Sequence, residues 1–310
     1  MILRRSLSAV LPALLLFASP GALAGTGAAA NAAPPPPPSP ASRQIAKPAL
    51  WKVSDADTTI WLFGTIHILP PGIDWYSGKI AKALEGSDTL VTEVVDADDP
   101  QVAAKVAQIA LAEPGRNLRD QLPADVRKTY EATLTALELP VSAFDANDPW
   151  YAAVALSTLP IMKQGYGVVN GAEAQLTARA KARGMRQVGL ETAEQQLGLF
   201  DSLPAETQVT YLSEVLESFP KVGDEIHAMV EAWKAGRADE LARLMNEDES
   251  DPMLMKVLLV DRNKAWAQWI AKRLEQPGTV FVAVGAGHLA GRESVQAQLA
   301  AQKIQAKRVR

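Results

Sequence analysis

The sequence contains no cysteine, and this absence limits how the chain can be held together. It excludes a disulfide framework and lipid attachment through an N-terminal cysteine. Any bound metal ion must be held by histidine and carboxylate side chains, because thiolate ligands are missing. The fold therefore has to rest on its hydrophobic core, which 310 residues with 48% hydrophobic content can supply.

An excess of positive charge is also missing. Lys and Arg together number 31 against 35 for Asp and Glu, which gives a formal net charge of −4. Nucleic-acid-binding domains carry a clustered basic patch, and the basic residues at 307–310 are too few to form one. We therefore expect no nucleic-acid partner.

The N-terminal apolar run is too short to span a membrane. It extends from Leu7 to Phe17, whereas a spanning helix needs about 20 residues. Basic residues precede it, and the small-residue pattern Ala22-Leu23-Ala24 follows it as a cleavage site. Residues 1–24 are therefore predicted to be a signal peptide, with export through the Sec route to the periplasm or the medium and no transmembrane anchor. Residues 25–48, rich in Ala and Pro, are predicted to be a disordered linker.

From residue 49 on, apolar positions predict alternating strands and helices. Strands are expected over 50–53, 59–65, 88–95, 186–191, 279–285 and 304–309, with the first two forming a hairpin. Helices are expected over 77–84, 101–111, 124–137, 150–163, 172–183, 204–217, 222–234, 238–245, 253–274 and 291–302. The second and third strands, with the helix between them, have the pattern of a parallel βαβ unit. We predict one α/β domain over 49–310, with a mostly parallel central sheet built from both ends of the chain and a helical insertion over residues 100–275.

Histidine is scarce, and two of the three histidines share one local pattern. His67 and His288 each lie three residues after a glycine, Gly64 or Gly285, where an apolar strand ends. Glycine permits a close backbone approach at such a turn, so the loop can direct the imidazole back over the edge of the sheet. One such histidine usually only bonds a loop carbonyl. Two of them, in a chain with so little histidine, favour a functional site.

Two further predicted strands end in a carboxylate, Glu93 and Glu191. The carboxyl ends of parallel strands meet at one edge of a sheet, where ligand sites form, so we expect these carboxylates to share that edge with the two histidines. A buried carboxylate is costly unless it is paired or bound to a metal ion. Glu93 therefore either serves the site or forms an ion pair across the sheet, for which Arg262 is a candidate. Glu191 either serves the site or helps Thr192 to cap the next helix.

Other candidates have the pattern of ordinary structure. His227 lies inside an amphipathic helix, without a strand end or a glycine turn. Arg262 and Asn263 lie on a predicted helix, where such a pair usually faces solvent. The aromatic pairs at 150–151 and 266–269 are expected in the core.

Six segments, taken in order, resemble the TraB/PrgY/GumN family, also called TraB/GumN or Tiki-like. They are Leu50–Val53, Gly64–His67, Thr92–Glu93, Gly189–Gln195, Arg262–Asn263 and Ala283–Leu289. The resemblance implies an erythromycin-esterase-like or Tiki-like fold whose active site contains the two G-x-x-H histidines and the intervening glutamate. In Tiki-like members that site is a metal-dependent peptidase that uses manganese or cobalt. One departure is Gly171-Ala172-Glu173, where relatives have Gly-Val-Asp, and no role is assigned to Glu173.

The leading hypothesis is an exported metal-dependent hydrolase, with a peptidase as the favoured reaction and a peptide or small molecule as substrate. His67, Glu93 and His288 are the expected ligands of a divalent ion, manganese or cobalt by resemblance, with zinc as a further candidate. Such an ion lowers the pKa of its bound water and polarises the scissile carbonyl.

The remaining candidates are assigned supporting roles. Glu191 is the candidate general base or orienting residue, and Arg262 and Asn263 are candidates for stabilising the oxyanion. Three alternatives stay open. The first is a metal-independent hydrolase with a histidine base, as in esterase-like relatives, and the second is a protein that binds a peptide, a metal or haem without turnover. In the third, all four strand-end residues are structural and no ligand binds.

Overall fold

The computed structural model describes residues 44–95, 100–246 and 251–310. The predicted signal peptide and residues 25–43 of the predicted linker lie outside the described residues. The end of that linker is already part of the fold. Strand β1 (Gln44–Ile45) pairs in parallel with β4 (Ile73–Asp74), and Ala46 is buried.

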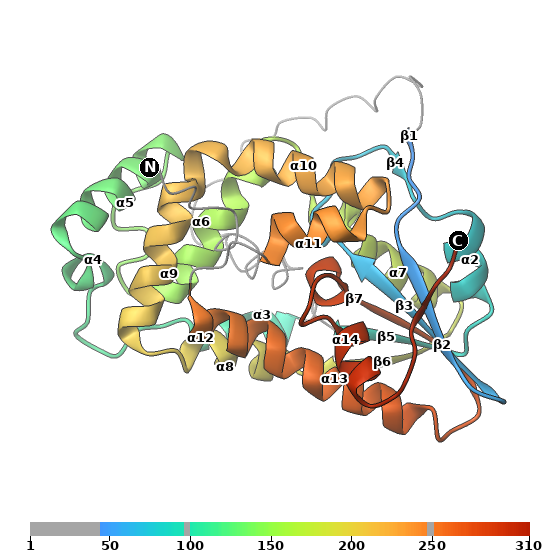
Figure 1. Ribbon diagram of the computed structural model, residues 1–310. Coiled ribbons are helices and arrows are strands. Elements are labelled where there is room, and N and C mark those ends of the chain that lie inside the picture. The colour runs from blue at the N-terminus through green and yellow to red at the C-terminus, as the bar shows by residue number, and fades with distance from the viewer. Residues whose placement is uncertain (1–43, 96–99, 247–250) are drawn as a thin grey trace.

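A six-stranded sheet forms one side of the molecule (Figure 1), in the order β6-β5-β7-β3-β2-β8. The strands are β2 (Leu50–Ser54), β3 (Thr58–Thr65), β5 (Thr89–Val94), β6 (Arg186–Glu191), β7 (Gly278–Gly285) and β8 (Lys307–Arg308). β6, β5, β7 and β3 run parallel, whereas β2 is antiparallel to both β3 and β8. The predicted α/β fold, with a mostly parallel sheet built from both ends of the chain, is confirmed.

The strand order shows how the predicted hairpin and the parallel βαβ unit are arranged in the sheet. The β2–β3 hairpin forms as expected, with Leu50 opposite Phe63. Helix α2 (Gly78–Glu85) connects β3 to β5, and both strands are parallel to β7. They are not neighbours, however, because β7 lies between them and pairs with each. Strand β7 therefore places its own turn directly beside the turn that follows β3.

Side chains alternate between the two faces of the sheet. Phe63 and Phe281 point to one face, where they share a core with the helices α2, α7 (Ala172–Ala182), α10 (Val222–Lys234) and α11 (Ala238–Asn246). Leu62 and Val282 point to the other face, which α13 (Asp261–Arg273) and α14 (Val295–Ala301) cover.

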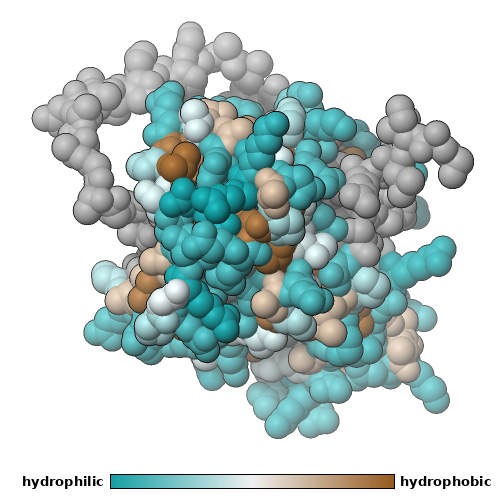
Figure 2. Space-filling view, turned by 90° about the vertical axis from the view of Figure 1, so that its left-hand side faces the viewer, coloured by the Kyte–Doolittle hydropathy of each residue, from teal (hydrophilic) through white to brown (hydrophobic). Residues whose placement is uncertain are grey.

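Part of the predicted helical insertion (100–275) has a core of its own, on the side of the molecule away from the sheet (Figure 1), whereas β6, α7, α10, α11 and α13, which also fall in that range, belong to the sheet or pack on it. Its helices are α3 (Pro100–Ile109), α4 (Leu118–Gln121), α5 (Ala124–Ala136), α6 (Pro149–Lys163), α8 (Ala193–Asp201), α9 (Ala205–Ser218) and α12 (Pro252–Met255), and 3-10 turns lie at Val168–Asn170 and Phe219–Lys221. α6 is buried along most of its length, including Trp150 and Tyr151 as predicted. The outer end of this part is mostly hydrophilic (Figure 2).

Among the described residues, no helix is both long enough and apolar enough to cross a bilayer.

Candidate functional site

Arg262 is the centre of a buried polar cluster at the carboxyl end of the sheet. Its side chain is 6% exposed and contacts three of the predicted site residues. Nε donates to both carboxylate oxygens of Glu191, at 2.9 and 3.1 Å, and Nη2 donates to Oε2 of Glu93 at 2.7 Å. Nη1 lies 3.1 Å from Nε2 of His288. The predicted ion pair between Glu93 and Arg262 is therefore confirmed.

The helix that carries Arg262 begins after an irregular turn. In place of the single helix predicted over 253–274, one turn wound as a π-helix (Lys256–Val260) separates α12 from α13. Such turns are frequent at functional sites. Arg262 follows at the second position of α13, and its Nη1 also donates to the Leu258 carbonyl at 3.2 Å. The expectation that Arg262 and Asn263 face solvent is wrong, because both are buried: this side of α13 packs against the sheet.

Glu93 remains ionised although it is 1% exposed. Its Oε1 accepts a hydrogen bond from the Gly285 amide at 2.7 Å, and Oε2 accepts one from Gln196 at 2.8 Å besides that from Arg262. Burial acts to raise the pKa of Glu93, but Arg262, the two nearby histidines and the Gly285 amide together hold this pKa at about 2. Strand β5 thus delivers a fixed negative charge to the cluster.

The hydrogen bonds of His288 determine which ring nitrogen carries the proton. A guanidinium can only donate hydrogen bonds, so Nε2 accepts from Arg262 and Nδ1 donates to Oδ1 of Asn263 at 2.6 Å. The Asn263 amide nitrogen donates to the Glu293 carbonyl, which orients its oxygen toward the histidine. Burial and the charge of Arg262 lower the pKa of His288 to about 3. The imidazole, in the 3-10 turn Ala286–Leu289, is neutral.

Trp266 and Gln196 belong to the cluster although the sequence offered no sign of it. The Trp266 ring centroid lies 4.4 Å from that of His288, and its indole N–H donates to Glu191. Trp266 was predicted as a core residue, and it is buried as well. Gln196 lies on α8, which begins after Thr192 in a capping box with Gln195. Thr192 therefore caps α8 as predicted, whereas Glu191 takes no part in the cap and forms an ion pair with Arg262.

His67 forms a separate pair with Glu173. Its Nδ1 lies 3.0 Å from Oε2 of Glu173, and both side chains are largely buried. The other ring nitrogen, Nε2, is buried without a hydrogen-bond partner in the described part of the chain. Burial lowers the pKa of His67, Glu93 acts to raise it and Arg262 to lower it. Burial also raises the pKa of Glu173 well above its usual range.

Glycine at position 171 makes the His67–Glu173 pair possible. A Cβ there would lie 2.0 Å from the His67 carbonyl oxygen, so α7 can begin this close only after a glycine. The Ala172 amide donates to the Ile66 carbonyl at 2.9 Å and ties the helix to the turn after β3. Glu173, in the first turn of α7, is thereby directed at the imidazole. In the sequence, the one indication of a role for Glu173 was that an acidic residue occupies the position where relatives have aspartate.

The four strand-end residues gather at one edge of the sheet, in two groups. Glu93, Glu191 and His288 share Arg262, whereas His67 contacts Glu173. The groups lie within electrostatic reach, because the charges of Glu93 and Arg262 act on the pKa of His67. The third histidine, His227, is exposed on α10, as expected.

The family profile described as TraB/PrgY/gumN matches residues 49–308. The chain belongs to this family. Comparison with curated proteins and with solved structures gave no match. Membership in the TraB/PrgY/gumN family carries no substrate with it, so the chemistry of this chain has to be argued from its own residues.

The predicted metal ligands can be tested against the hydrogen bonds they make. Nε2 of His67 is free to bind an ion, but the only lone-pair nitrogen of His288 faces the guanidinium of Arg262. Within the described residues, no group of three or more His, Cys, Asp or Glu side chains is arranged to hold a metal ion. His67, Glu93 and His288 do not fit an ion in this arrangement. Their assignment as ligands stays a prediction.

Proposed function

We propose that the protein is a hydrolase in which His67 is the general base. The observation that carries this proposal is the His67–Glu173 pair: Nδ1 lies 3.0 Å from a carboxyl oxygen of Glu173, while Nε2 is buried with no hydrogen-bond partner among the described residues. Burial lowers the pKa of His67, so the imidazole is neutral near pH 7 and able to accept a proton.

The proton transfers follow from this pairing. In this proposal the hydrogen of His67 is on Nδ1, the ring nitrogen that faces Glu173, and the lone pair is on Nε2, directed away from that carboxyl group. A water molecule bonded to Nε2 gives up a proton as its oxygen attacks the carbonyl carbon of an ester or amide. The imidazolium that forms lies beside the carboxyl group of Glu173 and within reach of the negative charge of Glu93, which favours the protonated ring. The imidazolium then protonates the leaving group.

Arg262 and Asn263 have a positioning role in this proposal. The guanidinium donates to Glu93, Glu191, His288 and the Leu258 carbonyl, and the Asn263 amide bonds His288 and the Glu293 carbonyl. Because these donors are committed to protein groups, they fix the charges around His67 and do not contact the oxyanion. Glu191, paired with Arg262, has the same role.

The metal-dependent peptidase is the second candidate. The unpaired Nε2 of His67 favours it, because a buried imidazole nitrogen is a common ligand of divalent ions. The contact between Arg262 and His288 opposes it. Export, inferred from the signal-peptide pattern of residues 1–24, is part of both proposals.

Panels of chromogenic esters and peptides, tested with full-length protein before and after exhaustive chelation, separate the two candidates. We expect turnover that survives chelation and is lost in His67→Gln, by at least about a hundredfold in kcat. His227→Gln is the matched control, because His227 is the exposed histidine of α10. Turnover that disappears on chelation and returns with manganese would support the metal-dependent reaction. Full activity in His67→Gln would refute both.

A further inference from the structure

A cavity lies outside the cluster of His67 and Arg262. Its volume is about 540 Å³, within the range of small-molecule sites. It lies at the β8 edge of the sheet, between that strand, the turn from α10 to α11 and the segment before α14. No residue of the cluster lines it. Trp51, Ala238 and Leu289 also line a narrow cavity of about 10 Å³ beside it.

Three arginines from different elements line the larger cavity. Arg237 lies in the turn before α11, Arg243 on α11 and Arg308 on β8, and the lining carboxylates are Asp239 and Glu240. Glu240 is taken by an ion pair with Nε of Arg237. Arg243 is exposed and has no hydrogen bond or ion pair to another described residue. The three arginines that line the larger cavity therefore have guanidinium N–H groups left over after the two lining carboxylates are paired.

Arg308 is held in place before any ligand arrives. Its Nη2 donates to the Gly236 carbonyl at 2.7 Å, and its guanidinium lies 4.8 Å from the centre of the Trp51 ring. Gly236 has a positive φ of 65°, and a Cβ there would lie 3.1 Å from Nη2 of Arg308 and 2.6 Å from the Lys47 carbonyl oxygen. The turn therefore needs glycine for its positive φ and for the close approach of the Lys47 carbonyl. A fixed guanidinium loses little freedom on binding a planar or tetrahedral oxyanion.

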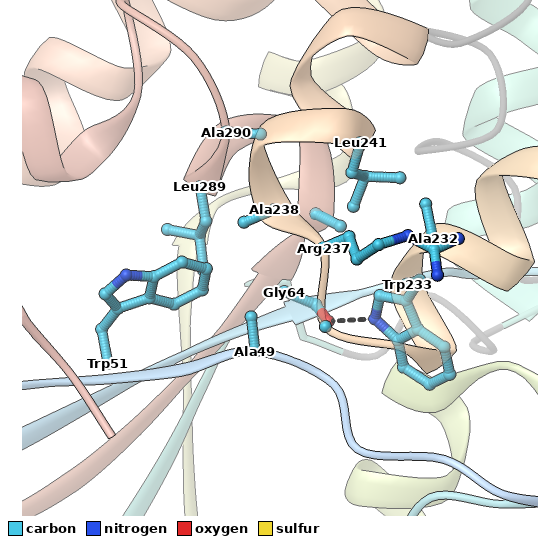
Figure 3. A pocket seen from close by; sticks show the side chains of 12 residues that line it. Ala49, Trp51, Gly64, Ala232, Trp233, Arg237, Ala238, Leu241, Leu289 and Ala290 are labelled. Carbon is cyan, nitrogen blue, oxygen red and sulfur yellow. Dashed lines mark hydrogen bonds between the residues drawn. The ribbon is translucent and has the colours of Figure 1, made fainter. Parts of the chain in front are cut away.

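The narrow cavity is apolar. Figure 3 shows Trp51 and Leu289 on one side of it, with Leu241 and Trp233 on the other and Ala238 between them. The indole N–H of Trp233 is already bonded to the Gly64 carbonyl at 2.8 Å, so this end offers few polar groups. At about 10 Å³ it has room for about one methyl-sized group, such as the end of a short alkyl chain.

We infer that the larger cavity binds a small organic oxyanion, with a carboxylate or phosphate head on Arg243 and Arg308 and a short alkyl group directed at the narrow end. The head group has to be charged, because charge-assisted bonds to guanidinium are the strong contacts available here. The alkyl group has to be short, because Ala238 and Leu289 close the narrow end.

Butyl phosphate, butyrate and 1-butanol test this inference, since they share one alkyl chain and differ in the head group. Titration of full-length protein, followed by calorimetry or by NMR shifts, should show binding of an anion and much weaker binding of the alcohol. Arg243→Gln should weaken binding of the anion by about tenfold or more, the loss expected for one charge-assisted contact. Ala238→Leu should weaken it as well, by filling the narrow end. Arg186→Gln, an exposed arginine on the opposite edge strand β6, should leave it unchanged.

These are binding measurements, so their outcome does not depend on whether the protein is a hydrolase. Butyl phosphate binding alone identifies a phosphate monoester, and butyrate binding alone identifies a carboxylate. Binding of neither anion, equal binding of the alcohol, or equal losses in Arg243→Gln and Arg186→Gln would overturn the inference. Arg308→Gln tests the other head-group contact and should weaken binding of the anion as well. Thermal unfolding of each variant shows whether it is folded.

Discussion

Nη1 of Arg262 lies 3.1 Å from Nε2 of His288, and this contact fixes the charge state of the histidine. A permanently charged donor cannot share its partner nitrogen with a second proton, so His288 stays neutral in the folded protein. The same guanidinium neutralises Glu93 and Glu191. One buried cation therefore acts on the pKa of both Glu93 and His288 and also forms an ion pair with Glu191, so it joins residues from three strand ends.

Arg262→Gln should destabilise the protein strongly. It leaves the buried carboxylate of Glu93 without its cation, and breaking a buried ion pair from one side costs about 3 to 5 kcal/mol. Urea denaturation measures the change in the free energy of unfolding. Arg186→Gln, at an exposed position of β6, should stay within about 0.5 kcal/mol of the parent protein. Similar losses in the two variants would show that the cluster contributes no net stability.

Stability should fall as the pH drops below the ordinary pKa of histidine. The pKa of His288 is lowered from 6.5 to about 3 in the folded protein, so between these values the unfolded chain binds more protons than the folded one. The contribution of the neutral His288 to the free energy of unfolding is complete above pH 6.5 and is lost on acidification toward pH 3. Glu93, whose pKa is lowered from 4.5 to about 2, adds to the loss between those lower values.

The comparison of the parent protein with His288→Gln isolates this effect. Unfolding free energies measured at a series of pH values should decline more steeply in the parent, by up to about 1.4 kcal/mol per pH unit. The glutamine amide can still bond both Arg262 and Asn263 but does not titrate. Parallel pH curves for the two proteins would contradict the assigned protonation of His288.

Glu173→Gln should slow the proposed reaction without unfolding the protein. Residues that orient a functional histidine contribute about 10- to 100-fold, and we expect a loss of that size in kcat with little change in KM. The acid limb of the pH profile should move to lower pH, because the imidazolium loses its counter-ion. Glu173→Asp should recover part of the rate. A loss of stability with an unmoved pH profile would indicate that Glu173 is only structural.

Gly171→Ala should displace the turn that carries His67. The added Cβ would lie 2.0 Å from the His67 carbonyl oxygen, so either α7 or the turn has to move, at a cost of about 1 to 3 kcal/mol. Gly198→Ala is the control, because the new methyl on α8 meets nothing within 4 Å. It should be neutral, or stabilising by up to about 1 kcal/mol. Equal unfolding free energies for the two variants would argue against the close packing of α7.

The sequence predicted most elements and the location of the site, because both depend on local pattern. Apolar runs that end in His67, Glu93, Glu191 and His288 marked the carboxyl edge of the sheet, and the structure places all four there. The contact between Glu93 and Arg262 was named as an alternative because a buried carboxylate needs a partner.

The sequence could not predict the features that depend on which distant segments of the chain come into contact. Nothing local shows that β7 lies between β3 and β5, or that one side of α13 is buried with Arg262 on it. The role of Glu173 required knowing that α7 starts against the turn after β3. Gln196 contacts Glu93 across 103 positions of sequence, at a distance set by tertiary packing alone.

The central position of β7 has a consequence for the synthesis of the protein. Glu93 bonds the Gly285 amide, 192 residues further along the chain, and both β3 and β5 need β7 as a neighbour. Contacts of such high sequence separation form late and slow the folding of a domain. Until the last tenth of the polypeptide has been made, β3 and β5 each have an open edge and Glu93 lacks the Gly285 amide. A chain stopped short of residue 278 would lack the strand that joins β3 to β5, and His288 with it.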